Sequence, residues 1–125
     1  MDSEHEMDVD AVDETKRSYI ALLSVPTDKI TVVPGASSDL TSMTFSIKDE
    51  DHTLGNALRW TIMQNPRVDF CGYSIPHPSE AKLHIRIQTH STSAVRAMQE
   101  GIEDLNAVCG LVKNKFQKRV AEMQK

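Results

Sequence analysis

The sequence is poor in the residues that mark small secreted scaffolds, membrane spans and many cofactor sites. Its 125 residues include two cysteines, five glycines, one tryptophan, two tyrosines and three phenylalanines. Two widely separated cysteines, Cys71 and Cys109, are too few for the disulfide framework of a small secreted fold, so we expect a reduced, intracellular protein. No apolar run approaches the roughly 20 residues of a membrane span, and the acidic N-terminus has no apolar core of a secretory signal.

Charge is distributed unevenly along the chain. The formal net charge is -4, yet residues 1–14 contain seven acidic residues and no Lys or Arg. Residues 15–125 contain all 14 bases and the other 11 acids. This excess of positive charge is too small to indicate nucleic-acid binding, for which a clustered basic face is typical. The bases near the C-terminus suit the end of a helix, with phosphate contact as the alternative. These bases are Lys113, Lys115, Lys118, Arg119 and Lys125.

The composition divides the chain into an arm and one domain. Residues 1–27 have too few apolar side chains to offset the entropy of ordering, which predicts an acidic, disordered arm. Residues 28–125 contain every periodic segment and are predicted to form a single domain.

Alternating and β-branched residues predict four strands, over residues 29–33, 41–48, 68–75 and 82–89. In the last of these, Leu83, Ile85 and Ile87 share one face. His84 lies on the opposite, polar face, where we expect contact with solvent or a partner. Between the second and third strands, helical spacing of apolar residues predicts a helix near 54–64, with Thr53 as N-cap and Asn65-Pro66 as its end.

A longer apolar repeat follows the fourth strand. It predicts a helix over 93–123, about 46 Å long at 1.5 Å per residue. Because a 100-residue domain has a radius of gyration of about 13 Å, this helix should extend beyond its own sheet and need a second surface. A helix lying wholly on its own sheet is the alternative. Two glycines, Gly101 and Gly110, each destabilise a helix by about 1 kcal/mol relative to alanine, so they could interrupt it. Cys109 lies in the apolar repeat and is interpreted as a small buried hydrophobe.

The predicted order is therefore β-β-α-β-β-α. We expect an α+β fold of two layers, in which a mostly antiparallel four-stranded sheet carries both helices on one face and a long C-terminal helix.

Catalytic and metal-binding patterns are scarce. The chain has no GxGxxG, GxxxxGK[ST] or GxSxG motif, and its five histidines and two cysteines have no spacing that suits zinc. Asp51-His52 could serve as a general base pair. The acids beside it also suit a helix N-terminus, where His52 can hydrogen-bond locally and Gly55 permits a close approach between backbones. We interpret the stretch as a structural turn and keep a small acid–base enzyme as an alternative.

Several motifs resemble a known family. The segments "HTLGNALR" (52–59), "NPRVDFCGYSIPHPSE" (65–80) and "IRIQT" (85–89) resemble the N-terminal domain of the bacterial RNA polymerase α subunit and its archaeal L-subunit-like and eukaryotic relatives. Within that family, "FCGYSIPHPSE" is most similar to the small α-like subunit shared by RNA polymerases I and III. The polymerase II counterpart keeps the "DHTLGN" and "HP" signatures but departs around the strand that leads to the "HP".

The resemblance implies a non-catalytic subunit with no cofactor, metal or small-molecule substrate. It implies a heterodimer with the larger α-like subunit, which forms the platform for the second-largest and other small subunits of polymerases I and III. DNA contact would come only through the assembled complex. The implied location is the nucleus, with polymerase I in the nucleolus and polymerase III in the nucleoplasm, where they transcribe ribosomal RNA precursors, 5S rRNA and tRNAs. The polymerase II equivalent and a homodimeric coiled-coil adaptor are the alternatives.

The resemblance also assigns roles to residues. A first interface helix would contain Leu54, Leu58, Arg59 and Ile62. A second would contain Met98, Ile102, Leu105, Cys109, Val112 and Phe116. The turn that orients the first helix would be shaped by His52, Thr53, Gly55 and Asn56.

Overall fold

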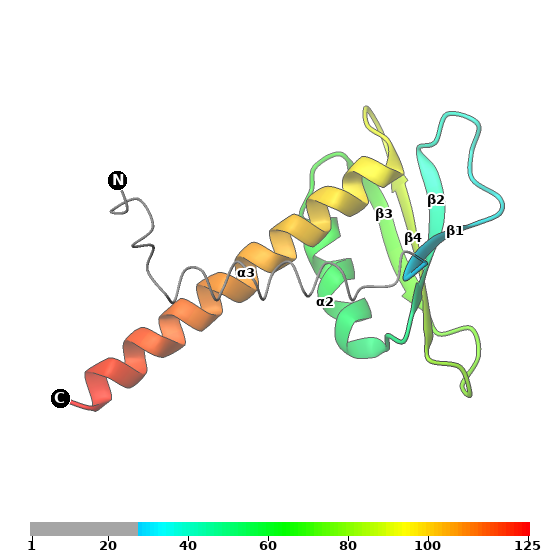
Figure 1. Cartoon of the computed structure of the whole chain (residues 1–125). Helices are drawn as coiled ribbons and strands as arrows, with labels where there is room; N and C mark the ends of the chain where they lie inside the picture. Colours follow the sequence, from blue (N-terminus) through cyan, green and yellow to red (C-terminus); the bar gives the residue numbers. More distant parts are fainter. Residues whose placement is uncertain (1–27) are drawn as a thin grey trace, which may run out of the picture.

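The structure, a computed structural model, describes residues 28–125, so the predicted acidic arm over 1–27 lies outside the described residues. Four strands form one sheet in the order β1-β2-β4-β3, and every neighbouring pair is antiparallel. Two helices, α2 and α3, lie on one side of the sheet, and α3 projects far beyond it (Figure 1). This confirms the predicted α+β fold and its β-β-α-β-β-α order. The strands and helices are β1 (Ile30–Val33), β2 (Ser42–Lys48), α2 (His52–Met63), β3 (Val68–Ser74), β4 (Lys82–Thr89) and α3 (Ala94–Met123).

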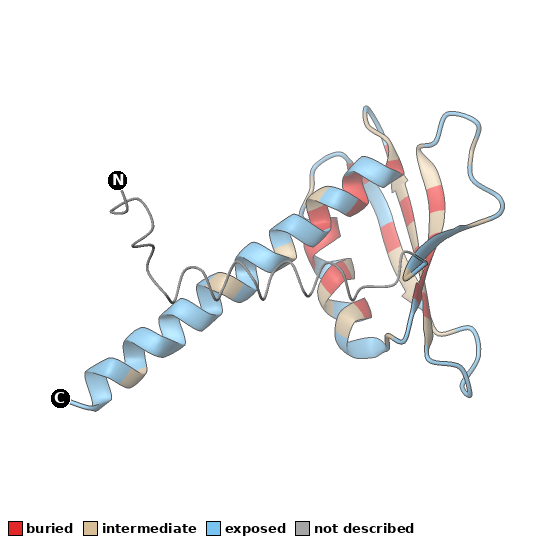
Figure 2. Cartoon of the chain, viewed as in Figure 1, coloured by how far each residue is buried: buried red, intermediate tan, exposed pale blue. Residues whose placement is uncertain are grey.

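The core lies between the sheet and the two helices, where the buried positions gather (Figure 2). Register keeps apolar side chains together, because Phe45 pairs with Ile85 and Ile47 pairs with Leu83 across β2 and β4. A slip of one residue would move a whole strand's apolar side chains to the solvent face. The helices contribute Leu58 and Ile62 from α2, and Ala94, Ala97 and Met98 from α3.

The start of α2 differs from the prediction. Asp51, not Thr53, is the N-cap, and its carboxylate accepts a hydrogen bond from the backbone N–H of Thr53 at 2.9 Å. A short carboxylate in extended backbone can reach an N–H two residues onward, which satisfies one free donor of the first turn. That hydrogen bond also lowers the pKa of Asp51. The helix therefore begins at His52, two residues before the predicted start.

The predicted long helix is confirmed almost residue for residue. Ser93 caps α3 by accepting a hydrogen bond from the backbone N–H of Arg96 at 3.1 Å. The helix runs unbroken through Gly101 and Gly110 to Met123. No helix within residues 28–125 combines the length and apolar character needed to cross a membrane.

Candidate protein–protein interface

The long helix changes environment along its length. Its first two turns are buried through Ala94, Ala97, Met98 and Gly101. From residue 102 onward nearly every position is exposed, apart from partial cover at Leu105, Gly110 and Val120 (Figure 2). The prediction that the helix extends beyond its own sheet is therefore correct, and the alternative of a helix lying wholly on that sheet is wrong.

Gly101 sets the closest approach between the two helices. A Cβ atom added at Gly101 would lie 2.4 Å from Cγ1 of Ile62, a fully buried side chain of α2. Only a residue without a side chain allows this packing. Gly101 has a low helix propensity, but the close packing of α3 against Ile62 of α2 requires a glycine at this position.

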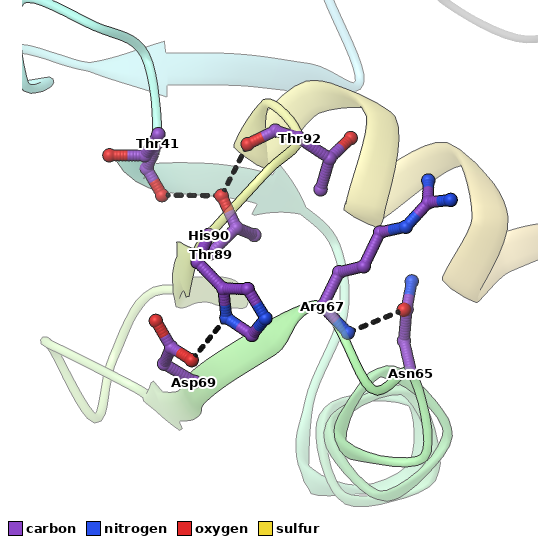
Figure 3. A network of polar contacts seen from close by, with 7 residues as sticks. All are labelled: Thr41, Asn65, Arg67, Asp69, Thr89, His90 and Thr92. Carbon is purple, nitrogen blue, oxygen red and sulfur yellow. Dashed lines mark hydrogen bonds and ion pairs between the residues drawn. The ribbon is translucent and has the colours of Figure 1, made fainter.

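Polar contacts fix the point where α3 leaves the sheet (Figure 3). The Thr89 hydroxyl lies 3.0 Å from the carbonyl oxygen of Thr41 and 2.7 Å from that of Thr92, which joins the end of β4 to the loop before α3. Asn65 accepts a hydrogen bond from the backbone N–H of Arg67 at 3.0 Å. These contacts hold the loops that orient both helices.

Three further bonds extend this network. The Asn65 side-chain amide donates to Glu100 of α3 at 2.8 Å, which links the end of α2 to the second helix. His90 Nδ1 lies 2.6 Å from an Asp69 carboxylate oxygen, and the backbone N–H of His90 donates to the carbonyl of Arg67 at 3.0 Å. These bonds gather at one edge of the sheet, where β3 starts and β4 ends, and they hold the loops next to the start of α3.

The projecting part of α3 carries an apolar stripe, here called the α3 stripe. Single exposed apolar residues are normal on protein surfaces, but a continuous row is typical of an interaction site. The side chains of Val112 and Phe116 are 62% and 68% exposed. The α3 stripe consists of Ile102, Val108, Cys109, Leu111, Val112, Phe116 and Met123.

The structure separates the predicted second interface helix into two groups. Met98 is buried in the chain's own core, and Leu105 packs partly against it. The other four predicted residues are exposed on the projecting segment: Ile102, Cys109, Val112 and Phe116. The interpretation of Cys109 as a buried hydrophobe is wrong for this chain by itself, because no element of the described residues reaches that far along α3.

The first predicted interface helix shows the same division. Leu58 and Ile62 are fully buried against the sheet and α3, whereas Leu54 and Arg59 are half-buried. The exposed apolar residues of α2 are instead Trp60, at 56%, and Met63, at 40%.

Sequence reasoning overlooked several of the exposed residues. Trp60 and Met63 were missed because the helical spacing was read along the inward stripe of α2. Their own spacing of three residues marks a second apolar face on that helix. Val108 and Leu111 have the same spacing and lie beside the residues predicted for the second interface helix, so they widen the α3 stripe.

Two of the four predicted turn-shaping residues, His52 and Gly55, contact Tyr73 of β3. His52 Nδ1 lies 2.9 Å from the Tyr73 hydroxyl, and the two rings meet edge to face. A Cβ atom at Gly55 would lie 2.7 Å from the Tyr73 ring, so the close approach is to a side chain and not between backbones as predicted. Thr53 donates its backbone N–H to the cap, and Asn56 is exposed.

Both members of the possible acid–base pair therefore have structural roles in the turn. Asp51 uses its carboxylate as a cap, and His52 is bonded to Tyr73. Among residues 28–125, no three His, Cys, Asp or Glu side chains are placed to hold a metal ion.

These features agree with a known domain family. Residues 42–115 match the model of the RNA polymerase Rpb3/Rpb11 dimerisation domain, and this segment spans β2, α2, β3, β4 and most of α3. The chain belongs to this family.

Named relatives place the chain more closely. The chain is 57% identical over 105 residues to the DNA-directed RNA polymerases I and III subunit RPAC2 of Schizosaccharomyces pombe, covering 83% of each chain. It is 55% identical over 98 residues to the subunit of the same name in Saccharomyces cerevisiae, covering 77% of this chain and 69% of that one. The resemblance found in the sequence is confirmed.

A solved structure shows the same fold. The RNA polymerase subunit L of Thermoplasma acidophilum superposes with a TM-score of 0.63 at 22% identity, covering 76% of this chain and 91% of that one. At this identity, the similarity supports the architecture of the sheet and the two helices.

Proposed function

We propose that this chain is a non-catalytic core subunit shared by DNA-directed RNA polymerases I and III. In this role it pairs with the larger α-like subunit and forms part of the platform on which the second-largest and other small subunits assemble. It supports transcription of ribosomal RNA precursors, 5S rRNA and tRNAs in the nucleolus and nucleoplasm. The high identity to subunits named for these two polymerases favours this assignment over polymerase II.

The observation that carries the proposal is the α3 stripe. A helix that projects from its domain with exposed Val112 and Phe116 has apolar surface that its own sheet cannot cover. The other helix, α2, also has exposed apolar residues, Trp60 and Met63. Burying apolar area releases about 25 cal/mol per Å², so a partner that covers both helices gains substantial free energy.

The charges on α3 favour a different partner over a second copy. The last 13 residues contain five bases and one acid, Glu122, which is bonded to Arg119 at 3.3 Å. Parallel self-pairing would place these like charges close together, which costs free energy. A heterodimer with a complementary helix avoids that cost, whereas a homodimeric adaptor paired in parallel does not.

A non-catalytic role is supported by the turn before α2. Both groups that could act in acid–base chemistry, Asp51 and His52, hold the N-terminus of α2 in place. We therefore assign nucleotide addition, and any direct contact with DNA, to other subunits of the assembled complex.

The test is a tagged purification from native extract with two matched substitutions. Val112→Asp places a charge in the α3 stripe, where an unpaired charge in a covered interface costs several kcal/mol. Asn114→Asp adds the same charge about 200° around the helix from Val112. Val112 is preferred to Leu105, because Leu105 packs partly against the core and its substitution would also disturb the fold.

Mass spectrometry then identifies the proteins recovered with each variant. We expect the wild type and Asn114→Asp to recover the large subunits of both polymerases I and III with the larger α-like subunit, and Val112→Asp to recover none. Recovery of polymerase II subunits alone would make the assignment to polymerases I and III wrong. Unchanged recovery with Val112→Asp would place the interface elsewhere.

A further inference from the structure

The side of the sheet that faces away from the helices is cationic. Buried Leu83, Ile85 and Ile87 point toward the helices, so the alternate side chains of β4 lie on the opposite side, here called the open face. In the strand register, Lys82 of β4 lies directly opposite Lys48 of β2. Like charges directly opposite each other destabilise a sheet unless an anion lies nearby.

The open face has no carboxylate among its register-paired positions. On β2 and β4 these positions hold hydroxyl, amide and basic side chains, and on β3 they hold Phe70, Gly72 and Ser74. The acidic residue of β3, Asp69, lies at the bulge and is bonded to His90. The basic side chains of the open face are Lys48, Lys82, His84 and Arg86.

The middle of the open face forms a hollow of about 370 Å³. The Arg86 guanidinium is held along it by donating to the Thr44 hydroxyl at 3.3 Å and to the Gln88 side chain at 3.2 Å. Phe70 lies over Gly72, where an added Cβ would be 2.9 Å from the ring. His84 completes the lining next to Arg86. The hollow thus presents cationic and hydroxyl groups that suit carboxylates.

The chain already supplies one carboxylate from its N-terminal side. Asp28, which precedes β1, is bonded to Lys48 at the corner of the open face. This contact lowers the pKa of Asp28. The segment before Asp28 therefore joins the domain beside this face.

We propose that residues 1–14, the acidic part of the N-terminal arm, bind across the open face with their carboxylates on Arg86, His84 and Lys82. Residues 1–14 contain seven acids and no Lys or Arg, which complements a face whose paired strand positions carry no carboxylate. The hydroxyls of Thr44 and Ser74 provide further donors at the hollow.

The connecting residues can span the distance required. Arg86 pairs with Thr44, which lies four residues along β2 from Lys48, so it is about 14 Å from the position of that lysine. Residues 15–27 reach up to about 44 Å when fully extended.

The rival cationic surface is the C-terminal end of α3. Lys113 lies 12 residues beyond Gly101, the last buried residue of that helix, which places it about 18 Å farther out. Lys125 is about 36 Å beyond the same point. An intramolecular contact weakens as the span to be bridged grows, so the nearer open face is favoured.

This proposal is independent of the α3 stripe, because the helices and the open face lie on opposite sides of the sheet (Figure 1). The arm could then remain bound while the helices are covered by a partner. Its contact is predicted to be sensitive to salt, since the Debye length falls from about 10 Å at 0.1 M to about 3 Å at 1 M.

Photo-crosslinking of the full chain, purified with its partner proteins, tests the proposal. The photoreactive residue p-benzoylphenylalanine replaces Val9, and peptide mapping locates the crosslinks at 0.1 M and 1 M salt. We expect crosslinks concentrated in β2 and β4 at low salt, reduced at least fivefold at high salt. Arg86→Glu should reduce them by a similar factor, whereas Lys118→Glu, an equal charge change on α3, should leave them unchanged.

A second variant removes the risk that Arg86→Glu perturbs the sheet. Replacing the seven acids of residues 1–14 by Asn or Gln leaves the domain unaltered, and it should also reduce the crosslinks at least fivefold. Equal yields from the neutral and acidic arms would overturn the proposal, because proximity alone would then account for them. Crosslinks found mainly in residues 113–125 of α3, or in another polypeptide, would overturn it as well.

Discussion

The two parts of α3 share one helix and one apolar repeat but have different surroundings. Residues 94–101 pack against the sheet and α2, whereas the apolar residues beyond 101 are mostly exposed. The difference follows from the sizes of the elements. The 12 residues of α2 extend about 18 Å, and the 30 residues of α3 extend about 45 Å. The shorter helix can therefore cover only residues 94–101 of α3, here called the root of α3.

This comparison shows that an apolar repeat predicts a covered face without saying what covers it. The root of α3 contributes to the stability of the chain itself. The projecting segment can contribute only when another protein is bound, since an apolar side chain gains free energy only when it leaves water. Substitutions in the two segments should therefore affect different measurements.

The largest expected difference lies between Met98→Ala and Val112→Ala. Met98 is 4% exposed, and truncating a buried methionine costs about 2–5 kcal/mol of unfolding free energy. Val112 is 62% exposed, so its truncation should change that free energy by less than about 0.5 kcal/mol. Urea unfolding at low protein concentration, followed by circular dichroism at 222 nm, measures both. Equal losses would mean that the projecting segment is covered within the chain, and the comparison would fail.

The two glycines of α3 sharpen the comparison because the same substitution should have opposite signs. At Gly101 the new methyl group would collide with Ile62, and overpacking of this kind costs about 1–3 kcal/mol. At Gly110 nothing lies within 4 Å, so alanine should stabilise the helix by up to about 1 kcal/mol. Thermal unfolding of the two variants should shift the midpoint down for Gly101→Ala and up for Gly110→Ala. Two downward shifts would show that Gly110 is also in a crowded site.

Much of this architecture could be predicted because local pattern and tertiary environment agree. In β4, alternation places Leu83, Ile85 and Ile87 on one face, and the structure buries all three. The projecting helix could be predicted from its length alone, since no domain of this size can cover it. The polymerase assignment came from the motif resemblance, which the periodicities could not supply.

Other features depend on contacts that a sequence pattern does not contain. Asp51 and Thr53 are both good N-cap residues, and the choice depends on the backbone path through the preceding turn, where Asp49 has a φ of 57°. Likewise, α2 has two apolar faces, and the sequence does not reveal that the one with Leu58 is inward and the one with Trp60 outward. Helix propensity alone predicts that Gly101 weakens α3, because a propensity does not include the contact with Ile62 of α2.

The smallest perturbation that tests the comparison is alkylation of the two cysteines, which needs no substitution. Cys71 lies in the core and Cys109 on the projecting segment. Burial raises the pKa of the Cys71 thiol to about 11. At pH 8 its reactive thiolate is therefore about a thousandfold rarer than its thiol, in addition to being shielded by the fold. We expect iodoacetamide to modify Cys109 at least about 100-fold faster than Cys71, with peptide mass spectrometry following each site.

The same reaction can distinguish burial in the chain's own core from burial by a bound partner. In urea both cysteines should react at similar rates, because the core that protects Cys71 is lost. In the native assembled complex Cys109 should also become protected, since it lies in the α3 stripe. Continued fast reaction of Cys109 in that complex would show that the partner leaves this side of α3 uncovered. Fast reaction of Cys71 in the free chain would show instead that the core opens readily, and that the root of α3 is less firmly held than its packing indicates.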